Sequence, residues 1–177
     1  SVFTNSGAIL TGGQAPAEAV EGEEAPVAPA PASLTVMDSV GGGNLTGATT
    51  GAVVVNSGSS FAMQDISIEK NYNTTTAGGG VILRSGSTMI MNSGAVSGNR
   101  GMGGSGIYVE KDAALTINGG AISGNRLVTS GHGAILTYGR VVMNGGEITQ
   151  NEVSHGNGAY YALAAIGEKA SFELKGG

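Results

Sequence analysis

Five charged residues occupy roughly corresponding places in successive segments of the chain and are the first candidates for hydrolytic chemistry: Arg84, Glu110, Lys111, Asp112 and Arg140. Hydrolysis of a glycosidic bond needs carboxylates that are brought close together. The aspartates Asp38 and Asp65 are instead scattered along the sequence. A solvent-exposed face held by ion pairs explains the five charges better than a catalytic cluster does, and we predict no catalytic residues.

Metal or nucleophile chemistry would have to involve the two histidines, His132 and His155, which both lie in Gly/Ser-rich segments. A metal site would need a third ligand, and Glu152 is the only acid nearby. Ser130 and Ser154 are close in sequence, but no Gly-x-Ser-x-Gly motif and no paired acid accompany them. We interpret both histidines as solvated loop residues and predict neither a metal nor a cofactor.

Composition removes further classes of function. The 177 residues include 33 glycines and no cysteine, which excludes disulfides, thiolate zinc sites and cysteine nucleophiles. The net charge of −5 argues against a sequence-independent nucleic-acid binder. No run of about 18 apolar residues occurs, so we expect no membrane-spanning helix. Glycine-rich strings such as residues 101–106 lack a following Gly-Lys-Ser/Thr and are not phosphate loops.

An internal repeat organises the chain. Its first element, a glycine followed by three mostly apolar residues, occurs six times, at 7–10, 51–54, 80–83, 106–109, 133–136 and 158–161. A second element follows at 89–92, 115–118 and 141–144, and a third closes the unit at 96–99, 122–125 and 148–151. Short apolar stretches separated by Gly, Asn and Ser are typical of strands.

Three short strands in each repeat predict a solenoid in which every unit is one coil and the strands form three sheets. One coil cannot bury its own apolar side, but stacked coils can. The prediction is an all-β fold of about six coils, with residues 1–177 forming a single segment of a longer chain. Residues 12–31, rich in Pro and Ala with four glutamates and no basic residue, are expected to be a mobile loop insertion.

Asparagines recur at the predicted corners and should form columns, because stacking places equivalent residues about 4.8 Å apart. The first column contains Asn71, Asn99, Asn125 and Asn151. The second contains Asn92, Asn118 and Asn144, with Asp38 and Asp65 in the equivalent places. Asn tolerates the left-handed backbone of a tight corner, and its amide can bond the copies above and below it. We predict structural ladders; a row that binds sugar or metal is the alternative.

A binding stripe is predicted in the first strands, at the second residue after each glycine: Ile82, Tyr108, Ile135 and Tyr160. The fourth residue is often polar, and if it faces solvent the second residue does so too. An exposed apolar and aromatic stripe would mark contacts with a partner. The alternative buries this column and corrects the rest of the strand with a local bulge.

The Gly-Ala-Ile-Leu motifs at 7–10 and 133–136, and the Val/Ile-x-x-Asn motifs at 96–99, 122–125 and 148–151, carry a family likeness. The units resemble the parallel β-helix repeats of bacterial surface proteins, among them the chlamydial polymorphic outer-membrane proteins and glycine-rich cell-wall proteins of Gram-positive bacteria. In the chlamydial repeats Phe stands where this chain has Val or Ile. The resemblance implies a right-handed, pectin-lyase-like β-helix and a secreted adhesin.

These observations together predict a non-enzymatic extracellular protein at a bacterial cell surface, either an adhesin or a stalk or filament segment. The predicted partners are a host or sibling surface protein or a glycan, with end-to-end self-association of the solenoid. A polysaccharide lyase or glycoside hydrolase on the same scaffold is the alternative function. A passive spacer without a partner is the third.

Overall fold

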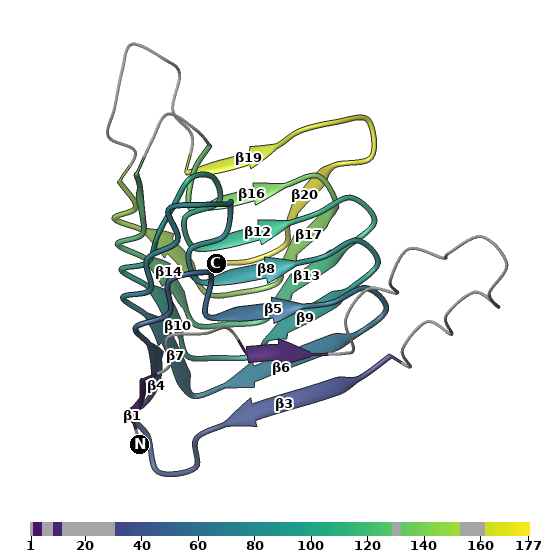
Figure 1. The fold of residues 1–177 in the computed structure, drawn as a ribbon. Coiled ribbons are helices and arrows are strands. Elements are labelled where there is room, and N and C mark those ends of the chain that lie inside the picture. The colour runs from purple at the N-terminus through teal and green to yellow at the C-terminus, as the bar shows by residue number, and fades with distance from the viewer. Residues whose placement is uncertain (1, 5–8, 12–30, 129–131, 153–161) are drawn as a thin grey trace, which may run out of the picture.

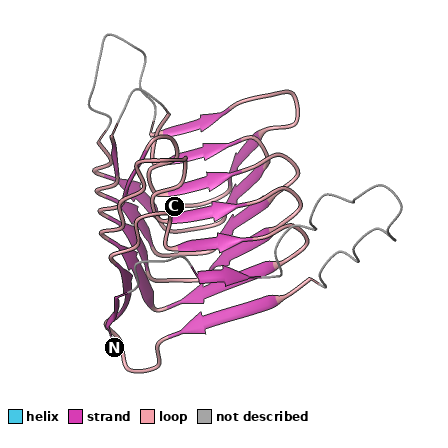
Figure 2. Cartoon of the chain, in the orientation of Figure 1, coloured by secondary structure: helices cyan, strands magenta, loops and turns pink. Residues whose placement is uncertain are grey.

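The computed structural model describes residues 2–4, 9–11, 31–128, 132–152 and 162–177, which wind into a solenoid of parallel strands (Figure 1). All regular elements in these residues are strands, joined by turns and loops (Figure 2). Three sheets of six strands each form three faces, and the chain visits the faces in a fixed order. The predicted class, an all-β parallel solenoid, is confirmed.

Face 1 consists of the first strands of the repeats: β2 (Ile9–Thr11), β5 (Val53–Val55), β8 (Val81–Leu83), β12 (Ile107–Val109), β16 (Ile135–Thr137) and β19 (Leu163–Ala165). Face 2 consists of the second strands: β3 (Ser33–Met37), β6 (Ser60–Gln64), β9 (Thr88–Met91), β13 (Ala114–Ile117), β17 (Arg140–Met143) and β20 (Ser171–Leu174).

Face 3 consists of the third strands: β1 (Val2–Thr4), β4 (Gly43–Thr46), β7 (Ile66–Glu69), β10 (Ala95–Ser97), β14 (Ala121–Ser123) and β18 (Glu147–Thr149). Neighbouring strands within each face pair in parallel, each with its equivalent in the next coil. Six strands on each face correspond to about five turns of the chain.

Apolar columns fill the interior, because side chains alternate between inside and outside along a strand. On face 2 the inward columns contain Met89, Leu115 and Val141, followed two residues later by Met91, Ile117 and Met143, and all six are buried. On face 3 the inward column contains Ile68, Val96 and Ile122, none of which is exposed. Leu174 occupies an inward position but is 65% exposed, because β20 is an edge strand.

The first asparagine column forms a continuous ladder at the corner after face 3. Nδ2 of Asn71 donates to Oδ1 of Asn99 at 2.8 Å, Asn99 donates to Asn125 at 3.0 Å, and Asn125 donates to Asn151 at 3.0 Å. Each receiving Oδ1 also accepts the backbone N–H of the preceding asparagine in the ladder. Ala48 donates its N–H to Asn71, so Ala48 occupies the equivalent place one coil earlier. The ladder satisfies backbone groups that the corner would otherwise leave without partners.

The second asparagine column is an exposed ladder between faces 2 and 3. Asn118 donates to Asn92 at 2.9 Å and Asn144 donates to Asn118 at 2.8 Å. The prediction that Asp38 and Asp65 are equivalent to these asparagines is wrong. Met63 pairs with Met91, which aligns the residue after Met63 with Asn92 and shifts Asp65 one place further along. Asp65 instead accepts a hydrogen bond of 2.7 Å from the hydroxyl of Ser93.

The predicted repeat boundaries need correction at both ends. The last strand of face 1 is β19 at Leu163–Ala165, not the Gly-Ala-Tyr-Tyr motif at 158–161, which lies outside the described residues. A glycine followed by apolar residues is a weak strand marker in a chain so rich in both. A further strand, β1, precedes the first predicted unit. The predicted insertion at 12–31 is described only at Pro31, which is exposed.

The corner between faces 3 and 1 is larger than a three-sided solenoid requires. Segments 70–80 and 98–106 connect these faces, whereas 47–52 suffices one coil earlier. A short extra sheet forms there from β11 (Arg100–Gly101) and β15 (Arg126–Leu127). Parallel bridges from Tyr72 to Arg100 and from Arg126 to Glu152 continue it. These connections therefore stack on one another as the strands do.

Candidate functional site

The predicted binding stripe combines two different columns of face 1. Ile82 and Tyr108 are partners in one column, but Tyr108 pairs with Leu136 in the next coil. Ile135 belongs to the inward column with Ile107 and has no exposed surface. The error arises because β16 begins two residues after its glycine, whereas β8 begins one residue after its own. A count from the glycine therefore slips by one residue and changes the side of the sheet.

The outward column of face 1 is not a flat solvent-exposed stripe either. Ile82 points away from the core but is only 2% exposed, because Gly51 and Gly78 of the corner segments lie against it. A side chain at Gly78 would collide with Ile82, so the close cover depends on that glycine. Tyr108 is half-buried, and Tyr160 lies outside the described residues. The sequence contained a signal for this cover. Segments 70–80 and 98–106 are longer than a simple corner needs, so they have residues to spare for folding over the face.

The charged residues that lie at corresponding repeat positions pair across coils. Arg84 Nη1 contacts Glu110 Oε1 at 2.6 Å, and the other oxygen of Glu110 accepts the N–H of Ser85 at 3.0 Å. Arg140 Nη2 contacts Glu173 at 3.0 Å on face 2. Both oxygens of Glu110 are therefore engaged in holding neighbouring turns together, which is an arrangement that stabilises a surface.

The histidine segment contributes backbone contacts to the corner between faces 3 and 1. The carbonyl of His132 accepts the N–H of Gly104 at 2.9 Å, while His155 lies outside the described residues. Within the described ranges no group of three or more His, Asp and Glu is placed to hold a metal ion. Nor does that part of the chain contain a helix long and apolar enough to cross a membrane.

The turns between faces 1 and 2 contain the feature that the sequence analysis did not anticipate. Three successive coils use four-residue turns there, 56–59, 84–87 and 110–113, whereas the next coil uses only 138–139 and the last uses 166–170. Backbone hydrogen bonds align the short turn: Tyr138 donates to Val109 and Arg140 donates to Ala113. Tyr138 and Gly139 therefore take the places of Glu110 and Ala113, and the equivalents of Lys111 and Asp112 are missing.

Local contacts hold the short turn in place. The N–H of Gly139 donates to the buried hydroxyl of Thr137 at 3.0 Å, which closes the chain within two residues. A side chain on Gly139 would collide with the carbonyl oxygens of Glu110 and Ala113 in the coil before. Glycine is needed here for this close approach of two backbones.

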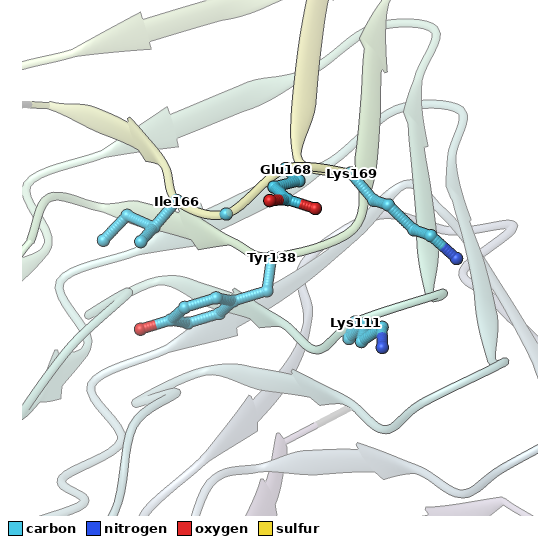
Figure 3. A pocket seen from close by; sticks show the side chains of 6 residues that line it. Lys111, Tyr138, Ile166, Glu168 and Lys169 are labelled. Carbon is cyan, nitrogen blue, oxygen red and sulfur yellow. The ribbon is translucent and has the colours of Figure 1, made fainter.

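The missing residues leave a cavity of about 220 Å³, which we call the corner recess. Its lining comes from three successive coils and comprises Lys111, Tyr138, Ile166, Gly167, Glu168 and Lys169 (Figure 3). The turns before and after the short one lie two strand spacings apart, or about 9.6 Å. Nζ of Lys169 lies 3.9 Å from Oδ1 of Asp112, so an ion pair bridges the two outer turns.

Tyr138 is fixed within the corner recess by a second tyrosine. The rings of Tyr108 and Tyr138 meet edge to face, with centroids 6.0 Å apart and planes at 76°. Burial, followed by the nearby Tyr138 and Glu110, raises the pKa of Tyr108 above its ordinary value. Tyr138 is itself half-buried, so part of its side chain remains open to the recess.

Lys111 differs from the other basic residues in having no partner among the residues that the structure describes. All eight Lys and Arg residues lie within the described ranges. Six have a carboxylate within ion-pairing distance, and Arg100 lies over the ring of Tyr72 at 5.9 Å. Among the described residues Lys111 has neither kind of partner, and its side chain lines the corner recess. The recess thus combines an aromatic side chain, an aliphatic side chain and an available ammonium group.

Comparison with known proteins gives no relative from which a function could be transferred. No family model, no curated protein and no solved structure matches this chain. Any assignment of function therefore rests on the residues and geometry described above.

Proposed function

We propose that this chain is a non-enzymatic segment of an extracellular surface protein, in which the solenoid rigidly displays a binding surface to a protein or glycan partner. The resemblance of the repeats to bacterial adhesin repeats supports the bacterial cell-surface location. The role is an adhesive or stalk segment, and its mechanism is the presentation of several weak contacts on one stiff body.

The observation that carries this proposal is the continuous stacking of the coils. The strand faces, the buried asparagine ladder and the apolar columns all run from coil to coil. Each coil is thereby fixed relative to the next, so surface groups keep a constant spacing. Binding sites held on a rigid body at fixed spacing gain from multivalency without paying the ordering entropy of a flexible linker.

The charges also favour display over catalysis. Glu110, the best candidate acid for the alternative enzyme, is engaged by Arg84 and by the N–H of Ser85. Asp112 lies beside Lys169. Carboxylates that pair with cations in this way hold neighbouring coils together, and a rigid solenoid needs such contacts between its coils.

A binding screen with the full chain tests the proposal. The protein is displayed both as free chains and at high density on beads, against arrays of glycans and surface proteins, with heat-unfolded chain as the control. We expect at least one ligand that binds the folded chain, with stronger retention on the dense beads. If the chain binds no ligand on either array, the result supports a passive spacer. If an array glycan is cleaved, the result supports the alternative function as an enzyme.

The proposal includes end-to-end self-association through the terminal strands of the sheets, such as β3 and β20. An unpaired strand edge offers backbone groups to another chain. Sedimentation velocity over a hundredfold range of concentration should show a growing fraction of linear oligomers. A single monomeric species throughout that range would remove this part of the proposal.

A further inference from the structure

We propose that the corner recess binds one acidic monosaccharide unit of a glycan, with the sugar ring against Tyr138 and its carboxylate at Lys111. This inference rests on the proposed function, because it assigns a ligand class to one site on the displayed surface. It is carried by three observations: the origin of the recess, its lining, and the absence of a partner for Lys111 within the described part of the chain.

The size of the recess limits the ligand to a single ring. A volume of about 220 Å³ is below the range of about 300–1,000 Å³ that is usual for drug-sized ligands. The recess exists because the turn at 138–139 is two residues shorter than its neighbour, and the ion pair between Lys169 and Asp112 spans the shortened turn. Both ends of the 166–170 turn are hydrogen-bonded to the coil before it, from the N–H of Ile166 to Thr137 and from the N–H of Ser171 to Gly139, so this wall of the recess is held in place before a ligand arrives.

The lining matches the two kinds of surface on a sugar. A pyranose ring presents apolar C–H groups on its faces and hydroxyl groups around its edge. In the corner recess Tyr138 lies below the 166–169 turn, with Ile166 above the hydroxyl end of its ring and Glu168 above its other end (Figure 3). Glu168 can accept and Lys169 can donate hydrogen bonds to the hydroxyl groups. The edge-to-face contact with Tyr108 holds the aromatic ring in place before the ligand arrives.

The charge on Lys111 selects an acidic sugar over a neutral one. Its ammonium group lacks a carboxylate partner among the described residues, whereas Lys169 already has Asp112. A ligand carboxylate would supply that partner as a charge-assisted hydrogen bond. An acidic hexose of about 13 heavy atoms at modest ligand efficiency gives a dissociation constant of ~1 mM, so useful retention would depend on repeated display.

The test is a titration of the ¹⁵N-labelled full chain with four monosaccharides, followed by amide chemical shifts. Glucuronic acid and N-acetylneuraminic acid are the acidic probes, and glucose and N-acetylglucosamine are the neutral ones. We expect shifts at the amides of Gly139 and Gly167 with the acidic probes, at least fivefold tighter than with the neutral ones. Shifts confined to other residues, or no saturable shift at 20 mM sugar, would overturn the inference.

Matched variants separate binding from folding. Tyr138→Phe should keep the affinity for acidic sugars, and Tyr138→Ala should lower it at least tenfold. Lys111→Gln should bring acidic and neutral sugars to equal affinity, whereas Lys70→Gln, an exposed lysine beside Glu69, should change nothing. Thermal unfolding of each variant checks its fold, and Tyr138→Phe and Lys111→Gln remain informative if Tyr138→Ala does not fold.

The two proposals can fail separately. If the array screen finds a ligand and Lys111→Gln binds both it and the acidic sugars like the unmodified chain, the recess assignment is wrong and the display function stands. If the acidic sugars shift the recess amides but the arrays retain no chain, the site exists and the display function is wrong.

Discussion

Replacement of Asn125 by alanine tests whether the buried asparagine ladder holds the solenoid together. Asn125 has no exposed surface, and its side chain makes four hydrogen bonds. Its Nδ2 donates to the carbonyl of Val96 and to Asn151, and its Oδ1 accepts the backbone and side-chain N–H groups of Asn99. The Asn125→Ala variant leaves these groups without that partner inside the protein.

The expected cost follows from the number of bonds. At about 1 kcal/mol net for each hydrogen bond, Asn125→Ala should lower the free energy of unfolding by about 4 kcal/mol. That is a large fraction of the roughly 5–15 kcal/mol by which folded domains are stable. Asn118, in the second ladder of the same coil, is the matched control because its two ladder bonds are exposed to water. Asn118→Ala should cost less than about 1 kcal/mol, since water replaces the lost partners.

The assay is urea unfolding of the full chain and both variants, followed by far-ultraviolet circular dichroism. Solenoid coils contact only their neighbours, so unfolding can become stepwise when one interface is weakened. Hydrogen exchange then locates the loss, which we expect first at the amide of Asn99. If Asn118→Ala were as destabilised as Asn125→Ala, the reasoning would be refuted. The free energy lost with each ladder asparagine would then not depend on whether its hydrogen bonds are buried.

Three further changes test other parts of the structure. Gly139→Ala should lower the unfolding free energy by about 1–3 kcal/mol through overlap with backbone oxygens of the coil before, measurable as a lower melting temperature, and an unchanged value would contradict the tight turn. Glu110→Gln removes the partner of Arg84; because both side chains are partly exposed, the loss should be at most about 1 kcal/mol and should shrink in 1 M salt. Hydrogen bonds from backbone N–H groups, first that of Val40, hold the pKa of Asp38 below its usual value. A carboxyl whose pKa is lower in the folded state than in the unfolded state stabilises the fold above the unfolded-state pKa, and this stabilisation is lost as the pH falls through the folded-state pKa. Below about pH 4 the melting temperature of Asp38→Asn should therefore fall less steeply with decreasing pH than that of the unmodified chain.

The repeat made the strands of the described coils predictable, because each strand carries its own marker. Gly, Asn and Ser separate the apolar stretches, and alternation within a stretch identifies the inward residues. Met89, Met91 and Ile122 are buried as that alternation requires. The first asparagine ladder follows in the same way, since residues at equal positions in stacked coils must lie beside one another.

Residue counts across corners failed for a physical reason. A glycine marks where the backbone turns, but the distance from that glycine to the next strand varies by one residue between coils. One residue is enough to exchange the inside and outside of a strand, which is why Ile135 was placed on the wrong side. The cover over Ile82 was missed for a related reason, because a loop that folds back over a sheet has no periodicity of its own.

The same freedom of the corners explains how this fold can carry a site at all. The strands must keep nearly equal lengths and matching side chains, because each contacts its copies above and below. A corner needs only to connect two strands, so its length can change without disturbing the apolar columns. The two-residue turn that presents Tyr138 leaves the inward column of β17 buried at Val141. Removal of two residues from a stacked row of turns opens a recess whose walls are the neighbouring turns, while the apolar column beneath it stays buried. Sites on a solenoid of this kind should therefore be sought where corner length changes between coils, before they are sought among the repeated residues.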